Sequence, residues 1–141
     1  MQPMQPEVIE GRADLARAVA GRSDKEINRS VTGRSGELVK RVAEGMRHAF
    51  DPARAPGRSA VIQYDIRSPD GPLTFQVSVV GGRCDIAQGA PRRADVALAM
   101  SLPDFLRLVA GKLDGTFAVL TRRLSVHGDV LLARQMQQWF R

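Results

Sequence analysis

Apolar and polar residues alternate with a period of two through the middle of the chain, and this spacing predicts half-buried strands. The clearest run is 73–80, where the apolar positions are Leu73, Phe75, Val77 and Val79. Similar runs predict further strands at 60–66, 83–88, 94–100 and 123–127. Gly81 and Gly82 predict a tight hairpin turn between the second and third of the five strands.

Helical spacing of apolar residues flanks these strands on both sides. Two short helices are predicted in the first 34 residues, a longer one from a cap at Ser35 to about Phe50, and one from Ser101 to Gly111. A short helix after Asp114 and a terminal helix after Asp129 complete the set. Ser23 and Ser101 each precede an acidic residue by three positions, the pattern of a capping box.

These elements predict an α+β fold with a five-stranded, mainly antiparallel sheet that has one face covered by helices. The segment that holds the first two helices differs in composition from the rest of the chain, because residues 1–34 carry few apolar positions. We therefore expect an N-terminal helical extension over 1–34 and a main domain over 35–141. A chain of 141 residues is long enough to bury its own core.

The charge pattern limits the classes of molecule that the protein is expected to bind. The net charge is +6, but the arginines are scattered and no nucleic-acid recognition motif accompanies them. We expect no binding to nucleic acid, whereas weak contact with an anionic membrane surface is compatible with the charge. The single cysteine, Cys84, favours a reducing compartment, and the first residues lack a secretory signal pattern. A cytoplasmic protein is expected.

Residues that could carry chemistry are few. His127 and Asp129 lie two apart, but Asp129 is better placed as a helix cap, and His48 lies near Asp51 at the end of the first long helix. Cys84 is interpreted as a strand residue rather than a nucleophile. No catalytic residue, no metal ligand and no cofactor are predicted, and the sequence favours a binding protein over an enzyme.

Several short motifs follow one another in a characteristic order. They are Tyr64-Asp-Ile66 before Pro69-Asp-Gly71, Asp95-Val-Ala-Leu98, Ser101–Phe105, Gly111-Lys-Leu113, and Leu124 through Gly128-Asp129. Over roughly residues 38–140 the chain resembles the sterol carrier protein type-2 (sterol-binding) family, in the form of a bacterial single-domain member. The resemblance implies a carrier of sterols, fatty acyl chains or related lipids, with a cavity between the sheet and the C-terminal helices.

The resemblance gives the apolar stripes of the C-terminal helices a second interpretation. They are core residues by default, but in this family they would line the cavity. The candidate lining residues are Phe105, Val109, Phe117, Leu120, Leu132, Met136 and Phe140. Arg122 and Arg123 stand where the family has a small residue, often glycine followed by lysine, which implies a changed turn or a cation at the cavity opening. Both are candidates for polar contacts with the ligand.

Three hypotheses about function follow. The leading one is a carrier of a hydrophobic small molecule of fatty acyl, sterol-like or polyketide-like character. The alternative is an enzyme or accessory protein that folds a bound biosynthetic intermediate toward cyclisation or isomerisation, with the two arginines stabilising negative charge. The third is an interaction module built on residues 1–34. The sequence leaves the oligomeric state open, and it predicts that the terminal helix opens as a gate because nothing beyond Arg141 holds it.

Overall fold

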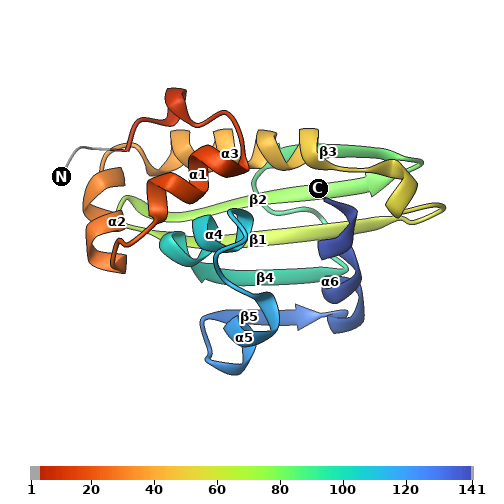
Figure 1. Ribbon diagram of the computed structural model, residues 1–141. Coiled ribbons are helices and arrows are strands. Elements are labelled where there is room, and N and C mark those ends of the chain that lie inside the picture. Colours follow the sequence, from red (N-terminus) through yellow and green to blue (C-terminus); the bar gives the residue numbers. More distant parts are fainter. Residues whose placement is uncertain (1–3, 141) are drawn as a thin grey trace.

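The computed structural model describes residues 4–140, and a single five-stranded sheet runs through its centre (Figure 1). The strands are β1 (Ala60–Ser68), β2 (Gly71–Val80), β3 (Arg83–Gln88), β4 (Val96–Ser101) and β5 (Leu124–Gly128). Their order is β3-β2-β1-β4-β5, and every neighbouring pair is antiparallel except β1 and β4. The expected sheet is confirmed.

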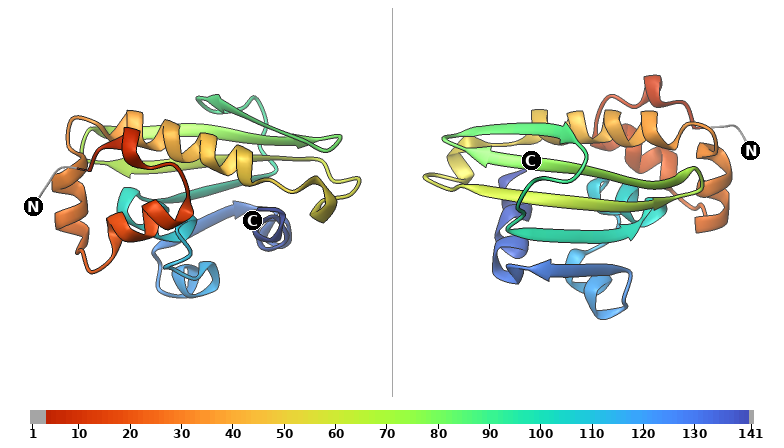
Figure 2. Two further views of the ribbon diagram at one scale, coloured as in Figure 1. Left: turned by 45° about the horizontal axis from the view of Figure 1, so that its top comes forward. Right: turned by 180° about the vertical axis from the view of Figure 1, so that it is seen from behind.

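The helices of the described part of the chain all lie on one face of the sheet, and none of them covers the opposite face (Figure 2). They are α1 (Arg12–Val19), α2 (Asp24–Val31), α3 (Ser35–Ala49), α4 (Leu102–Val109), α5 (Gly115–Leu120) and α6 (Val130–Met136), with 3₁₀ turns at Pro6–Val8, Pro52–Arg54 and Gln137–Trp139. Helices α1 and α2 pack against α4. Among the described residues, no helix has the length and apolar character needed to cross a membrane.

Most predicted helix starts are confirmed by side-chain caps. The Ser23 hydroxyl accepts the Glu26 amide while the Glu26 carboxylate accepts the Ser23 amide, which is a complete capping box. Asp114 and Asp129 accept amide hydrogens at the starts of α5 and α6. Because these caps satisfy amides that have no partner within the helix, each fixes where its helix begins.

Three local predictions are wrong. The first predicted helix is divided into a 3₁₀ turn and α1. Ser101 does cap α4, but the Asp104 carboxylate binds Arg107 and Arg123 instead of completing a box. Ser35 does not cap α3, because the carboxylate that accepts its amide belongs to Asp70, in the turn between β1 and β2.

An aromatic cluster marks the centre of the core. The Tyr64 ring stacks on Phe75 with 4.7 Å between ring centroids, and Phe105 of α4 meets both rings edge-on at 6.0 and 5.8 Å. Tyr64 lies directly opposite Phe75 on one side and Leu98 on the other. Alternation in β1 and β2 therefore directs these rings to the helix-covered face.

Candidate functional site

A pocket of about 1010 Å³ lies between the sheet and the helices. From the sheet it is lined by Tyr64, Leu98, Met100, Leu124 and Val126. From α3, α4, α5 and α6 the lining includes Val42, Met46, Phe105, Val109, Val119, Leu120, Val130 and Met136. A pocket of this size and apolar character is typical of a site for a hydrophobic small molecule.

The structure brings five of the seven expected lining residues to this pocket, namely Phe105, Val109, Leu120, Met136 and Phe140. Phe117 and Leu132 lie outside the lining. Phe117 of α5 is 52% exposed, and Leu132 of α6 is buried. Ligand contact by any of these side chains stays a prediction.

Arg123 is tied to the buried carboxylate of Asp104. Its Nη2 lies 2.6 Å from one Asp104 oxygen and its Nε lies 3.2 Å from the other, while Arg107 Nη1 lies 3.0 Å from the first. Burial alone would raise the pKa of Asp104, but the hydrogen bonds and charges of Arg123, and then of Arg107, lower it overall. To reach a ligand, Arg123 would have to leave this carboxylate.

Arg122 shows what replaces the expected glycine. Among the described residues, it is the only one other than glycine with a positive φ, at 62°. Its backbone therefore adopts the left-handed conformation that glycine takes without strain. Its side chain is exposed and lies outside the pocket lining.

The N-terminal segment forms one wall of the pocket. Ile9, Arg12 and Leu15 are lining residues. The segment is held to the main domain by guanidinium groups on both sides, because Arg12 Nε donates to the Val109 carbonyl at 3.0 Å and Arg41 Nε donates to the Ile9 carbonyl at 2.9 Å. Arg107 adds an ion pair with Asp24 of α2.

The C-terminal end is held more firmly than expected. Phe140 meets Phe50 edge-on with 5.8 Å between ring centroids, and the Asp51 amide donates to the Trp139 carbonyl at 2.7 Å. The Arg58 guanidinium lies 5.4 Å from the centroid of the Trp139 ring. Contacts of Trp139 and Phe140 therefore secure the end of the described chain, whereas opening of α6 as a gate stays a prediction.

In the described part of the chain, the side chains that could be reactive either lie outside the pocket or have no neighbour that activates them. Cys84 is buried in β3, and burial raises the pKa of its thiol to about 11, so the nucleophilic thiolate is scarce at neutral pH. His48 lines the pocket, but His127 does not. Within residues 4–140, no three His, Cys, Asp or Glu side chains gather as a metal site.

Sequence reasoning missed Tyr64, Leu98 and Met100, which form the floor of the pocket. The signal was present, because period-two alternation places Tyr64 on the same face as Ile62 and Ile66. The contribution of Ile9 and Arg12 had no such signal, since it depends on how a distant segment docks.

The comparisons with known proteins agree with this arrangement. A model of the SCP-2 sterol transfer family matches residues 39–141. Hydroxysteroid dehydrogenase-like protein 2 from Bos taurus is 27% identical over 136 residues, which is 95% of this chain and 32% of that protein. Its counterpart from Mus musculus is 32% identical over 81 residues, which is 56% of this chain and 16% of that protein. The chain thus spans less than a third of these relatives.

Solved structures show the same fold at low sequence identity. The sec-alkylsulfatase Pisa1 from Pseudomonas sp. gives a TM-score of 0.66 at 16% identity, over 74% of this chain and 17% of that one. Sterol Carrier Protein 2 Like 2 from Aedes aegypti gives 0.60 at 22% identity, over 70% and 93%. A palmitated form of the Aedes aegypti protein gives 0.58 at 23% identity, over 68% and 87%.

Proposed function

The chain belongs to the SCP-2 sterol transfer family, and from this premise we propose that it binds and carries a lipid or another hydrophobic metabolite in the pocket between sheet and helices. The observation that carries the proposal is the pocket itself, whose floor and helical walls are mostly apolar. The palmitated form of the Aedes aegypti protein supports an acyl chain as one such ligand.

Burial of apolar surface is a sufficient source of affinity here. Each 100 Å² of apolar ligand surface removed from water contributes about 2.5 kcal/mol. Immobilising the ligand costs part of that gain, so a long chain that contacts much of the lining is favoured over a short one. Lining cations, namely Arg12, Arg41, Lys112 and Arg134, support a ligand with one polar or anionic end.

Gly45 offers a direct test, because it lines the pocket from α3 and a Cβ added there meets no atom within 4 Å. We expect Gly45→Phe to weaken displacement of a fluorescent fatty acid at least about tenfold, since the ring fills the ligand's space. Folding stability should stay level or rise by about 0.5 kcal/mol, because glycine is unfavourable inside a helix.

Gly36→Phe is the matched control, since Gly36 lies on the same helix outside the pocket. It should leave fatty acid binding within twofold. The proposal fails if the purified wild-type protein neither retains an apolar molecule in native mass spectrometry nor exchanges the fluorescent fatty acid. It also fails if the two glycine variants bind alike.

We also propose that the pocket opening meets an anionic membrane surface during ligand exchange. Five exposed apolar side chains of α5 and α6, called the ridge below, support this, namely those of Phe117, Val119, Leu120, Val130 and Leu131. Val119, Leu120 and Val130 belong to the ridge and to the pocket lining at once. The net charge of +6, with exposed Arg122 beside the ridge, favours anionic lipid.

Vesicle binding tests the membrane proposal. Leu120→Ser with Leu131→Ser should reduce sedimentation with phosphatidylglycerol-containing vesicles about fivefold or more, because both leucines are more than 60% exposed. Val80→Ser, which changes an exposed valine in β2, is the control. Equal sedimentation of all three proteins would remove the ridge from the proposal.

As a second candidate function, we propose an enzyme or accessory protein that acts on a bound biosynthetic intermediate. The larger relatives support this candidate, because this region is less than a third of their length. It does not need the cavity to be catalytic. If Arg122→Ala and Arg123→Ala leave ligand handling unchanged, neither guanidinium takes part in chemistry. A cytoplasmic location remains part of the proposal and is supported by the single free cysteine.

We keep residues 1–34 as a helical extension of the domain at 35–141 and propose that it acts as a wall of the pocket rather than as a partner-seeking arm. The bonds of Arg12 and Arg41 across the boundary support this. Amide hydrogen exchange of the monomer should find α1 and α2 as protected as α4. Fast exchange confined to these two helices would favour the interaction module.

A further inference from the structure

We propose that the Tyr64 hydroxyl donates a hydrogen bond to a neutral oxygen in the interior of the bound lipid, so that the pocket prefers oxygenated chains. The relevant groups on the lipid are a ketone, a hydroxyl or an ester carbonyl placed away from its ends. This inference rests on the proposed function and deepens it, because it names the chemistry of the ligand at the same site.

Tyr64 occupies the centre of the pocket floor. It is the middle residue of β1, and β1 is the middle strand of the sheet. Its ring is fixed by stacking on Phe75, with an angle of 1° between the ring planes, and by the edge contact with Phe105. Because both neighbours constrain the ring, the direction of the hydroxyl is fixed before any ligand arrives.

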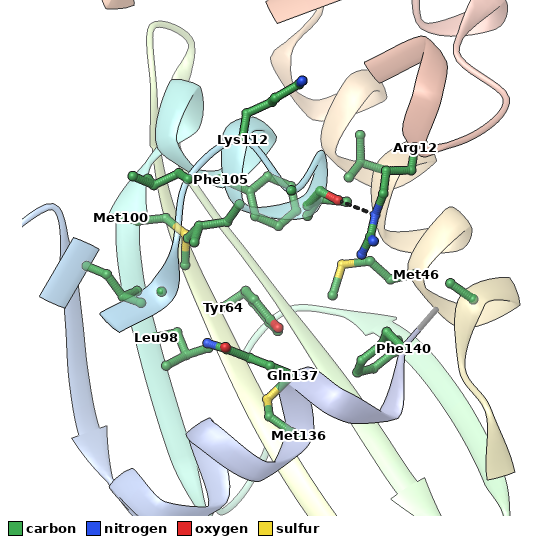
Figure 3. A pocket seen from close by; sticks show the side chains of 18 of the residues that line it. Arg12, Met46, Tyr64, Leu98, Met100, Phe105, Lys112, Met136, Gln137 and Phe140 are labelled. Atoms are coloured by element: carbon green, nitrogen blue, oxygen red, sulfur yellow. Dashed lines mark hydrogen bonds between the residues drawn. The ribbon is translucent and has the colours of Figure 1, made fainter. Parts of the chain in front are cut away.

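The hydroxyl points into the pocket, toward the side where Met136, Gln137 and Phe140 lie (Figure 3). Tyr64 is 6% exposed, and none of the hydrogen bonds within residues 4–140 involves its hydroxyl, which is not among the fully enclosed polar atoms without a partner and is therefore accessible from the pocket. Buried tyrosine hydroxyls generally have a partner, because an unsatisfied polar group in an apolar site is costly. A ligand oxygen would supply that partner.

The surroundings make this hydroxyl selective. The other sheet residues of the lining are Leu98, Met100, Leu124 and Val126, all apolar. Tyr64 is therefore the polar side chain that the sheet presents to the pocket among the described residues. A plain hydrocarbon chain crossing this floor would leave the hydroxyl unpaired, whereas a chain with an oxygen at that depth would pair it.

A neutral oxygen fits this position better than an ionised one. Burial raises the pKa of Tyr64 well above its usual value, so the phenol keeps its proton and donates it at neutral pH. The cations Arg12 and Lys112 come from α1 and from the loop after α4, on the helical side of the pocket (Figure 3). The sheet itself contributes no cation to the lining, since Arg41 and Arg134 come from α3 and α6, so an anion on the floor between Leu98 and Met100 would lose its hydration without a charged partner from the sheet.

Matched probes separate this inference from simple apolar binding. The probes are octadecanoic acid and its mid-chain keto derivative, each displacing the same fluorescent fatty acid. Tyr64→Phe keeps the ring and its stacking but removes the hydroxyl. We expect this variant to weaken binding of the keto derivative about tenfold more than it weakens binding of octadecanoic acid, which corresponds to a difference of about 1.4 kcal/mol.

Met136→Leu is the control, since it alters the pocket wall without changing polar groups. It should shift both probes alike. The chain has a single tyrosine, so a protein labelled with carbon-13 at the tyrosine Cζ gives one NMR signal and needs no substitution. That signal should move when the keto derivative binds and move less with octadecanoic acid.

Two results would overturn the inference while leaving the proposed function intact. One is equal weakening of both probes, or of neither, by Tyr64→Phe. The other is the same Cζ shift with both probes, which would mean that water remains the partner of the hydroxyl. If neither probe binds the wild-type protein, the proposed function itself fails and the inference falls with it.

Discussion

Two regions of the molecule use apolar residues in opposite ways. Around α2 and β2, neither of which lines the pocket, the core is filled, and the largest fully buried side chains come from α1 to α4, β1, β2 and β4. None of them comes from α5, β5 or α6, which instead wall the pocket. Of the seven large apolar side chains that are exposed within residues 4–140, five lie on α5 and α6.

The difference indicates a division of labour. Apolar contacts inside the filled region are made once, on folding, and they stabilise the chain without a partner. Apolar surface around α5 and α6 is left partly uncovered, so its burial awaits a ligand or a membrane. Substitutions in the two regions should therefore separate folding stability from ligand affinity.

The largest expected effect is in the filled region. Phe75 is 1% exposed and does not line the pocket. We expect Phe75→Ala to lower the free energy of unfolding by about 3–5 kcal/mol, because it opens a cavity in the aromatic cluster. Urea unfolding measures this change. A loss below about 1 kcal/mol would show that this half is not tightly packed.

The next effect concerns the link between the two regions. Asp104 of α4 binds Arg123, which lies between α5 and β5. Asp104→Asn should cost about 2–3 kcal/mol of stability, because it removes the charge that pairs with Arg123 and Arg107. Asp85→Asn is the control, since its pair with Arg83 is exposed and at 3.7 Å, and it should cost less than about 0.5 kcal/mol.

This pair also predicts a pH dependence. Because the pKa of Asp104 is lowered in the folded state, the unfolded chain binds the proton more readily. The stabilisation is therefore complete above the ordinary pKa of a carboxyl group, about 4. It is lost as the pH falls through the lowered pKa of Asp104. In Asp104→Asn this part of the acid-induced loss should be absent. An unchanged acid-unfolding profile would contradict the assignment.

Phe140 tests the pocket side of the comparison. Its ring is partly buried, lines the pocket and meets Phe50 edge-on. Phe140→Ala should weaken fatty acid binding about tenfold but cost only about 1–1.5 kcal/mol of stability, the size of one exposed aromatic contact. A stability loss of about 3 kcal/mol or more with affinity unchanged would assign this residue to the core and reject a gate at α6.

The smallest effect is a gain. Arg122 holds a positive φ in the turn between α5 and β5. Replacing it with glycine should raise the free energy of unfolding by about 1 kcal/mol, because glycine adopts this conformation without strain. Arg93→Gly, in the loop before β4, is the control and should not stabilise. A destabilised Arg122→Gly variant would mean that the side chain, rather than the backbone, matters there.

What the sequence could predict depended on how far apart along the chain the interacting residues lie. The strands, the hairpin at Gly81 and Gly82, and the caps at Ser23 and Asp129 were accessible because each depends on neighbours within a few residues. The Asp70 contact with the start of α3 was not, because it joins residues 35 positions apart. In the pocket, helical spacing identified Met136 but could not distinguish it from Leu132, since both face inward from α6.

One measurement tests the central claim most directly, namely amide hydrogen exchange of the wild-type protein with and without a bound long-chain fatty acid. The division of labour predicts that the ligand slows exchange in α5, β5 and α6 and leaves α2, β2 and β3 nearly unchanged, because only the first set borders the pocket. Equal slowing in both sets, or slowing in neither despite saturation, would contradict it.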